Sequence, residues 1–308
     1  MKREPSVEEY MEKIYPSLYK KISNVIRKSE KEYNGKNFKI ADSFLWDHTL
    51  QVSTFAYKLA LLEKVDPLIP VITALFHDSG KFIKGKYHID KKPEEEYSAE
   101  IARKILKQVR AQEDHICMVE DALRTLYQDR SRSNAACSIV HDSDFLVKFG
   151  YIGISNFFIK GALRGKPLQE IILSSLSKEL TYSSTAEFNM MTRSGKKLAV
   201  KRSRDSLKFF KSLLSEIREY GTGNYRIKNI KLDKMSRPAG SRIDDNIKIV
   251  LVEPESCVIC GGELNLSYNR DKGVKCEKLI AEFKCESCGN INEISFCIPE
   301  ISRAAGIK

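Results

Sequence analysis

The chain has 308 residues, of which 42% are hydrophobic and 30% charged, and its formal net charge is +11. This composition allows a sizeable hydrophobic core, so disorder is not the default, and the length allows one large domain or two ordinary ones. No apolar run reaches the roughly 18–20 residues of a membrane-spanning helix, and no apolar stretch follows the first residues as in a secretory signal. We therefore expect a cytoplasmic protein with no membrane partner.

The first two thirds of the chain show the apolar periodicity of amphipathic helices. We expect the first helix over residues 7–32, where apolar side chains recur at every fourth position. Asp42 or Ser43 can cap a second helix, which includes His48 in its first half.

A third helix is expected to begin after Pro67 and to end at His77-Asp78, with Gly80 as a stop signal. Further helices are expected over residues 93–109, 114–127, 135–149, 152–163, 168–176 and 195–220. Together these segments predict an all-helical domain over residues 1–221.

The pattern changes after residue 221. Residues 225–232 mostly alternate polar and apolar side chains, and residues 247–252 form a short apolar run, so both are expected to be strands. We expect a basic linker over residues 222–246 and a small β-rich module over residues 247–308. The predicted fold class is mainly α, with an all-helical domain followed by this module.

Nearly all of the excess positive charge lies in one segment. Residues 193–248 hold 16 lysines and arginines against 6 aspartates and glutamates, a net charge of +10. A basic segment suits an anionic partner such as nucleic acid. The plain alternative is a helix face and a linker that both face water.

Five residues supply the ligand types of a hydrolytic metal site. His77 and Asp78 end an apolar helix, His48 lies 29 residues before them, and Asp142 and Asp144 lie in a later helix. Imidazole nitrogen and carboxylate oxygen bind divalent metals, and such a ligand set leaves positions open for water and substrate. The sequence therefore predicts one metal site where these helices pack together.

These residues and their order resemble the HD-domain metal-dependent phosphohydrolases. The family pattern is a histidine, then a His-Asp pair often followed by x-Gly-Lys, then a late aspartate. The resemblance covers roughly residues 40–220 and rests on these stretches: Trp46-Asp47-His48-Thr49-Leu50-Gln51-Val52, His77-Asp78-Ser79-Gly80-Lys81, His141-Asp142-Ser143-Asp144-Phe145-Leu146 and Met191-Thr192-Arg193-Ser194-Gly195-Lys196-Lys197-Leu198-Ala199 with Arg202.

The resemblance implies a role for each residue. His48, His77, Asp78 and Asp144 would bind the metal, and Asp78 would also orient the attacking water. Asp142 would orient a ligand histidine or a metal-bound water, although the two aspartates exchange roles if the register differs. Lys81 would contact a substrate phosphate; the alternative is an ordinary lysine paired with a carboxylate.

Members of the family with two metals have further histidines between the His-Asp pair and the late aspartate. Here that interval has only His88 and His115 before His141, and both are expected at the surface. The segment ending in Leu126-Tyr127 has no histidine where related proteins often place one. We therefore expect one catalytic divalent metal, either Mn, Co, Ni, Fe or Mg.

Six of the eight cysteines lie between Cys257 and Cys297. Cys257 and Cys260 form one Cys-x-x-Cys pair, and Cys285 and Cys288 form another after 24 intervening residues. Four thiolates at this spacing resemble a zinc ribbon and predict one structural Zn. The alternative is four free thiols.

The two remaining cysteines of this cluster, Cys276 and Cys297, are expected to be a free thiol and a small buried residue. The zinc module could contact nucleic acid or could be structural or protein-docking. Its candidate stacking residues are Tyr225, Tyr268 and Phe283.

The sequence as a whole predicts a metal-dependent phosphohydrolase that acts on a phosphorylated substrate, either a nucleotide or a nucleic acid. A phosphomonoesterase, a phosphodiesterase and a nuclease all fit this prediction. The alternative is a nucleic-acid-binding or adaptor protein whose HD site is vestigial. Substrate, metal identity and oligomeric state stay open at this point.

Overall fold

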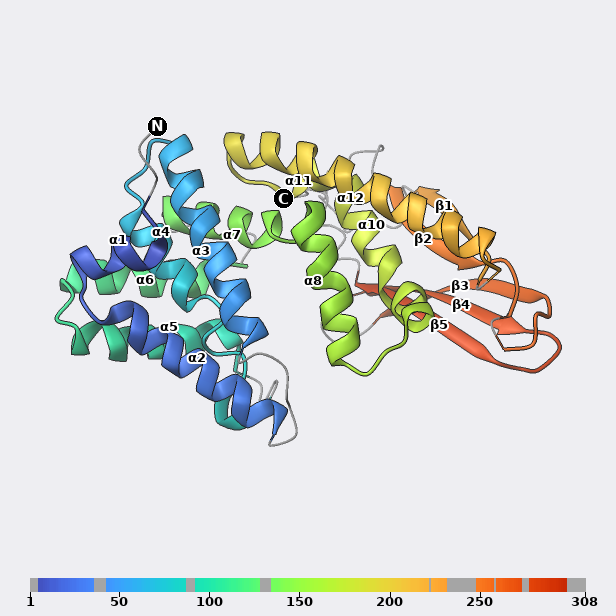
Figure 1. Ribbon diagram of the computed structural model, residues 1–308, viewed down its shortest axis with the longest axis horizontal. Coiled ribbons are helices and arrows are strands. Elements are labelled where there is room, and N and C mark those ends of the chain that lie inside the picture. Colours follow the sequence, from blue (N-terminus) through green and yellow to red (C-terminus); the bar gives the residue numbers. More distant parts are fainter. Residues whose placement is uncertain are drawn as a thin grey trace. The chain divides into compact units, whose positions relative to one another are not determined.

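The computed structural model describes residues 5–35, 43–86, 92–127, 134–221, 223–231, 248–257, 259–272 and 277–297 (Figure 1). The chain forms two compact units, described separately below. Unit 1 comprises Met1–Val147 and Met191–Gly195, and unit 2 comprises Lys148–Met190 and Lys196–Lys308. The domain boundaries expected after residues 221 and 246 stay a prediction.

Unit 1 is built from helices. Their bounds are α1 Val7–Ile14, α2 Leu18–Asn34, α3 Phe44–Leu62, α4 Leu68–Phe76, the short 3-10 helix η1 Ile83–Gly85, α5 Glu94–Gln108, α6 Glu113–Thr125 and α7 Ala135–Leu146. Large side chains such as Trp46 and Phe76 are fully buried between them. The predicted all-helical character of this region is confirmed.

The single helix predicted over residues 7–32 is wrong in one respect, because Pro16 divides it into α1 and α2. Proline has no N–H to donate and disfavours helical geometry at the residue before it. Tyr15 accordingly leaves the helical region, and Ser17 adopts a left-handed φ of 67° before α2 begins.

Unit 2 begins with helices. They are α8 Gly150–Leu163, α9 Leu168–Ile171, the π-helical turn η2 Ile172–Leu176, α10 Ser177–Ser184, α11 Ala186–Asn189 and α12 Arg193–Glu219, of which the first three residues belong to unit 1. The sequence did not predict α10 or α11. Serine and threonine have low helix propensity, because their hydroxyls compete for backbone hydrogen bonds, and α10 is rich in both.

The strands of unit 2 form two antiparallel sheets. In the first sheet, β1 Tyr225–Lys231 pairs with β2 Lys248–Pro254, so both predicted strands are confirmed. In the second sheet, β3 Leu264–Lys272, β4 Glu277–Cys285 and β5 Ile291–Cys297 lie in chain order. The predicted linker residues 232–246 and Cys276 lie outside the described residues.

Helix α10 packs against the edge of β2 that does not face β1. The backbone N–H of Val250 donates to the Thr181 hydroxyl at 3.0 Å, and that of Val252 donates to the Ser177 hydroxyl at 2.8 Å. Val250 and Val252 also join one hydrophobic core with Phe157 from α8. The first sheet is thus fixed to the helices of unit 2 by hydrogen bonds and by apolar packing.

In the part of the chain that the structure describes, no helix is both long and apolar enough to cross a membrane.

Candidate active site

Three helices of unit 1 that pack on one another, α3, α4 and α7, bring the predicted ligands together. His48 lies in the first half of α3, and His77 is the C-cap residue of α4. Asp78 follows in the next turn, and Asp144 lies in α7. The start of α3 is fixed by Ser43, whose hydroxyl accepts the Trp46 N–H at 2.9 Å.

The ligand atoms of His48, His77 and Asp78 all lie within 4.8 Å of one another. The Asp78 Oδ2 atom lies 3.7 Å from the Nε2 atoms of both His48 and His77. Asp144 joins this group through His48, whose Nε2 lies 3.3 Å from Asp144 Oδ1. Ligand atoms about 2.1 Å from one ion lie about 3.0 Å apart along the edge of an octahedron. The observed separations are slightly longer than that and suit a shared divalent ion.

His77 is prepared to act as a ligand. Its Nδ1 lies 2.7 Å from the backbone carbonyl of Ala74. A carbonyl only accepts hydrogen bonds, so Nδ1 must bear the proton and the lone pair must reside on Nε2. That Nε2 atom is buried and has no hydrogen-bond partner among the described residues. A buried, unpaired acceptor costs free energy, and a bound cation would satisfy it.

The protonation states also fit a cation. Burial lowers the pKa of His48, and although Asp144 and Asp78 act in the opposite direction, the pKa stays below its usual value. Burial would raise the pKa of Asp78, but Lys81, His77 and His48 outweigh it and hold that pKa well below its usual range. Neutral imidazole and ionised carboxylate are the forms that bind metals.

Lys81 contacts Asp78 directly. Its Nζ lies 2.9 Å from Asp78 Oδ2. Burial would lower the pKa of Lys81, but the Asp78 carboxylate raises it above its usual value, so the ammonium is charged at neutral pH. The pairing that the sequence left as the alternative is therefore present. A contact between Lys81 and a substrate phosphate stays a prediction.

Gly80 was predicted to end the helix, and in the structure it allows α5 to pack closely against this turn. Its N–H donates to the Ser98 hydroxyl of α5 at 2.9 Å, and this hydroxyl donates to the His77 carbonyl at 3.1 Å. A Cβ atom at Gly80 would lie 2.3 Å from the Glu94 carbonyl oxygen and 2.8 Å from the Ser98 nitrogen. Only glycine lets α5 approach so closely, and α5 in turn fixes the backbone of His77.

Tyr127 is a functional candidate that the sequence reading did not select. Its hydroxyl donates to Asp144 Oδ2 at 3.2 Å. Burial and the Asp144 carboxylate raise the pKa of Tyr127 well above its usual value, so the phenol is neutral and donates. The available signal was its position, because Tyr127 stands where related proteins often place a histidine. Its contact orients Asp144 toward His48.

Asp142 contacts the residues that precede α12. Its Oδ1 accepts the Met191 N–H at 2.8 Å, and its Oδ2 accepts both the N–H and the hydroxyl of Thr192 at 2.7 Å. Its other partner is the neighbouring His141, whose Nδ1 lies 3.1 Å from Oδ1. None of these partners is a predicted ligand. These contacts hold the start of α12, and the predicted role of Asp142 in orienting a ligand or a metal-bound water stays a prediction.

Among the described residues, neither His141 nor His115 belongs to the ligand group. His141 is buried and packs beside the Phe145 ring, with ring centroids 4.8 Å apart. His115 was expected to be a surface residue, but it is partly buried and its Nδ1 lies 2.6 Å from the Tyr15 hydroxyl. His88 lies outside the described residues.

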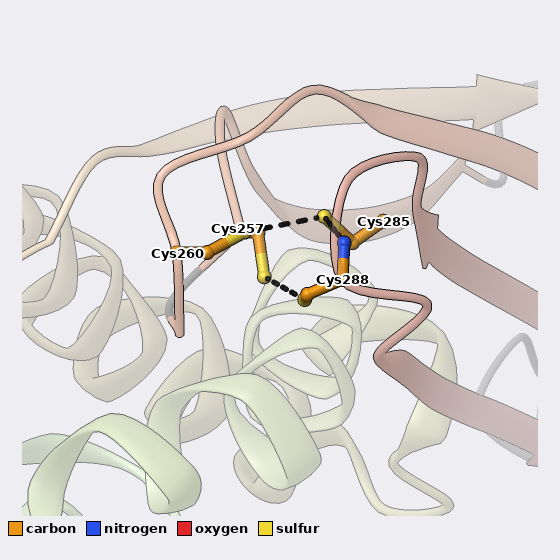
Figure 2. Close-up of side chains that lie close together, drawn as sticks. All are labelled: Cys257, Cys260, Cys285 and Cys288. Atoms are coloured by element: carbon orange, nitrogen blue, oxygen red, sulfur yellow. Dashed lines mark hydrogen bonds between the residues drawn. The ribbon is translucent and has the colours of Figure 1, made fainter.

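A second possible metal site lies in unit 2, where four cysteines face one another (Figure 2). The Sγ atoms of Cys257 and Cys288 lie 3.6 Å apart, and those of Cys260 and Cys285 lie 3.5 Å apart. Thiolates bound to Zn at about 2.3 Å lie about 3.8 Å apart in a tetrahedron. The spacing therefore suits a closed tetrahedral zinc site.

The backbone around the cysteines stabilises thiolates. The Cys288 N–H points at the Cys285 sulfur at 3.5 Å. This contact, together with the Ser287 N–H and the neighbouring thiols, outweighs burial and lowers the pKa of Cys285 to about 6. Gly261 and Gly289 follow the two pairs with a φ of 72° each, so they close the turns in a conformation that glycine adopts easily. Of the suggested stacking residues, Tyr225 and Phe283 are buried. The side chains of Tyr268 and Cys297 lie outside the description.

The sequence model of the HD domain matches residues 45–169, a stretch that includes all four predicted ligands of the catalytic metal. No curated protein matches the chain. Solved structures do. A predicted HD superfamily hydrolase from an uncultured Thermotogales bacterium is 22% identical, with a TM-score of 0.44, and the match covers 64% of this chain and 91% of the other.

Two proteins from Bacillus species are similar to the same extent. YpgQ of Bacillus subtilis, solved in complex with ADP, is 19% identical with a TM-score of 0.47, over 65% of this chain and 97% of the other. An HD-superfamily hydrolase from Bacillus thuringiensis is 19% identical with a TM-score of 0.44, over 65% and 98%.

Proposed function

We propose that the HD domain is a metal-dependent phosphohydrolase with one divalent metal, and that its substrate is a phosphoester of a nucleotide or nucleic acid. His48, His77, Asp78 and Asp144 would hold the metal. A bound ion of this kind lowers the pKa of a coordinated water and polarises a phosphoryl oxygen. Mn, Co, Ni, Fe and Mg all suit this mixed ligand set.

One observation is the main support for this proposal: the buried, unpartnered Nε2 of His77 faces the carboxylate of Asp78 and the imidazole of His48. With its Nδ1 proton bound to Ala74, His77 can offer only a lone pair in this direction. No protein hydrogen bond in the described residues uses that lone pair. The arrangement has the chemistry of a metal site rather than of a polar core.

The remaining residues would prepare the site for an anionic substrate. Lys81 adds a positive charge beside Asp78, where the charge can neutralise a phosphate that approaches the site. Tyr127 fixes one oxygen of Asp144 and leaves the other directed at His48. Asp78 is ionised and can accept a hydrogen bond from an attacking water, which would orient it.

The proposal is tested by metal content and hydrolysis measured on the same samples. Purified protein would be supplied with Mn²⁺, Co²⁺ or Ni²⁺ and assayed against nucleotides, cyclic nucleotides and single-stranded RNA and DNA. Asp78→Ala and Asp144→Ala should each lose one equivalent of metal and most of the activity. Asp121→Ala serves as the matched control, because Asp121 is an exposed carboxylate on α6 of the same unit.

Two outcomes contradict the proposal. Full activity in both ligand variants would place the chemistry elsewhere. Salt-dependent binding to RNA or DNA without turnover under any metal would instead favour the alternative, a nucleic-acid-binding or adaptor protein with a vestigial site. For the four cysteines we propose one structural zinc, which would be retained in both variants.

A further inference from the structure

The part of helix α12 that belongs to unit 2 has a row of cationic residues; the helix is yellow in Figure 1. They are spaced alternately by four and three residues and are all long side chains. We name this row the basic stripe, and it comprises Lys197, Lys201, Arg204, Lys208 and Lys211. At 3.6 residues per turn and 1.5 Å per residue, the stripe lies within an arc of about 80° and extends for about 21 Å.

The stripe faces water. All five of its side chains are exposed. Within the described part of the chain, no carboxylate pairs with any of them and no side-chain hydrogen bond uses them. A single exposed lysine is ordinary. Five unpaired cations on one helix face, with no acidic residue between them in the row, create a strong positive electrostatic potential.

Some other cations of the same unit are neutralised. Arg226 and Lys228 of β1 both pair with the buried Glu253, at 2.8 and 3.4 Å. Arg218, near the end of α12, pairs with Glu255 at 3.1 Å. The absence of partners along the basic stripe is therefore not the general condition of this unit in the residues that the structure describes.

The opposite face of α12 determines which anionic partner fits. Ala199, Phe210, Leu214 and Ile217 are buried, and the last three belong to the hydrophobic core of unit 2. An amphipathic helix that binds a membrane inserts its apolar face into the lipid. In α12 that face is already occupied by protein, so the stripe can offer only charge.

We infer that the basic stripe is a docking surface for the phosphodiester backbone of a nucleic acid. One strand of a duplex has a phosphate about every 3.4 Å, so the stripe is long enough to follow about six phosphates. Such contacts position a strand without reading its sequence. This surface goes beyond the proposed hydrolysis and does not depend on it, because a docked strand need not be the substrate.

The test is a salt series of fluorescence anisotropy titrations with the full chain and labelled 20-nucleotide RNA, DNA and duplex DNA. The stripe variant replaces Lys197, Lys201, Lys208 and Lys211 by Gln, which keeps helix propensity. The control variant replaces Lys13, Lys20, Lys104 and Lys107 by Gln. These are also exposed helical lysines without an ion-pair partner in the described residues, but they lie in unit 1.

We expect wild-type binding to weaken steeply with salt. The stripe variant should bind at least about tenfold more weakly, and its slope of log K against log salt should be shallower by up to about 3 for single strands. The control variant should stay within about twofold of wild type. The stripe variant should retain the metal content of wild type, which separates docking from the proposed chemistry.

Three results would overturn the inference. One is wild-type protein that binds none of the three probes. Another is equal loss of affinity in the stripe and control variants, which would indicate a response to net charge alone. The third is binding to vesicles of phosphatidylcholine and phosphatidylserine but not to nucleic acid, which would assign the stripe to a membrane surface. Circular dichroism of the stripe variant should show unchanged helix content.

Discussion

Asp142 and Asp144 lie about half a helical turn apart on α7. The structure predicts that replacing them has opposite effects on stability and on metal binding. Asp142→Asn should lower the stability of unit 1 substantially and leave the ligand group in place. Asp144→Asn should leave the stability almost unchanged and remove a ligand of the proposed metal. Both substitutions conserve side-chain size, so they change hydrogen bonding and charge without creating a cavity.

The magnitude follows from the contacts of Asp142. Three hydrogen bonds, from the Met191 N–H and from the N–H and hydroxyl of Thr192, end on its fully buried carboxylate. A net contribution of about 1.5 kcal/mol for each bond to a charged group gives about 4–5 kcal/mol. The remaining oxygen of asparagine keeps about half of this stabilisation. Its NH₂ group replaces the other oxygen and faces a backbone N–H, so two donors oppose each other. We expect a loss of about 3–4 kcal/mol.

Asp144 has a different environment. Its Oδ2 accepts the Tyr127 hydroxyl, and an amide oxygen could accept the same bond. Replacing the carboxylate also removes its repulsion with nearby Asp78. We therefore expect a change of about 1 kcal/mol or less in the metal-free protein.

The assay is urea denaturation followed by tryptophan fluorescence. Trp46 is the only tryptophan of the chain, and it is 1% exposed in α3, so its emission reports the unfolding of unit 1. Metal content is measured on the same variants. Equal stability of the two variants would refute the assignment of Asp142 to the start of α12. Loss of metal in Asp142→Asn with unchanged stability would restore its predicted role at the ligands.

Three further predictions concern single contacts. Tyr127→Phe removes the donor to Asp144 and should weaken metal binding roughly tenfold in a metal titration; unchanged affinity would mean that Asp144 is held in other ways. The pKa of Asp78 is below its unfolded value, so its pairing with Lys81 stabilises the metal-free protein above about pH 4 and is lost as the pH falls through the folded-state pKa. In urea titrations, the free energy of unfolding that Lys81→Gln loses relative to wild type should accordingly stay constant from about pH 5 to 8 and become smaller below about pH 4. A loss that becomes larger in acid would contradict this prediction. Cys285→Ser should release the proposed zinc and reduce strand content in far-ultraviolet circular dichroism, whereas strands that persist without metal would show that the module folds on its own packing.

The sequence predicted those parts of the site that depend on local pattern. His48, His77 and Asp78 stand on or at the end of strongly periodic helices, so both their existence and their convergence could be expected. Helix ends also followed from local chemistry, as at Ser43, which caps α3. Asp144 beside His48 agrees with the order implied by the family resemblance.

The features that were missed depend on contacts distant in sequence or on a conflict of local signals. Pro16 interrupts a helical apolar pattern, and its effect on the backbone outweighs that pattern. The partners of Asp142 lie about fifty residues away, so no local pattern separates its role from that of Asp144. Gly80 has the sequence appearance of a helix stop, and only the approach of α5 shows why a side chain is excluded there.

The hydroxyls of Ser177 and Thr181 have a consequence for association between chains. An exposed strand edge is a template on which another chain can add a strand, and such edges lead to aggregation. On β2, these hydroxyls occupy backbone N–H groups that an incoming strand would need. Better helix formers at these positions would strengthen α10 but leave two buried N–H groups of this edge without an acceptor. The serine and threonine content of α10 can thus be understood as protection against unwanted strand exchange.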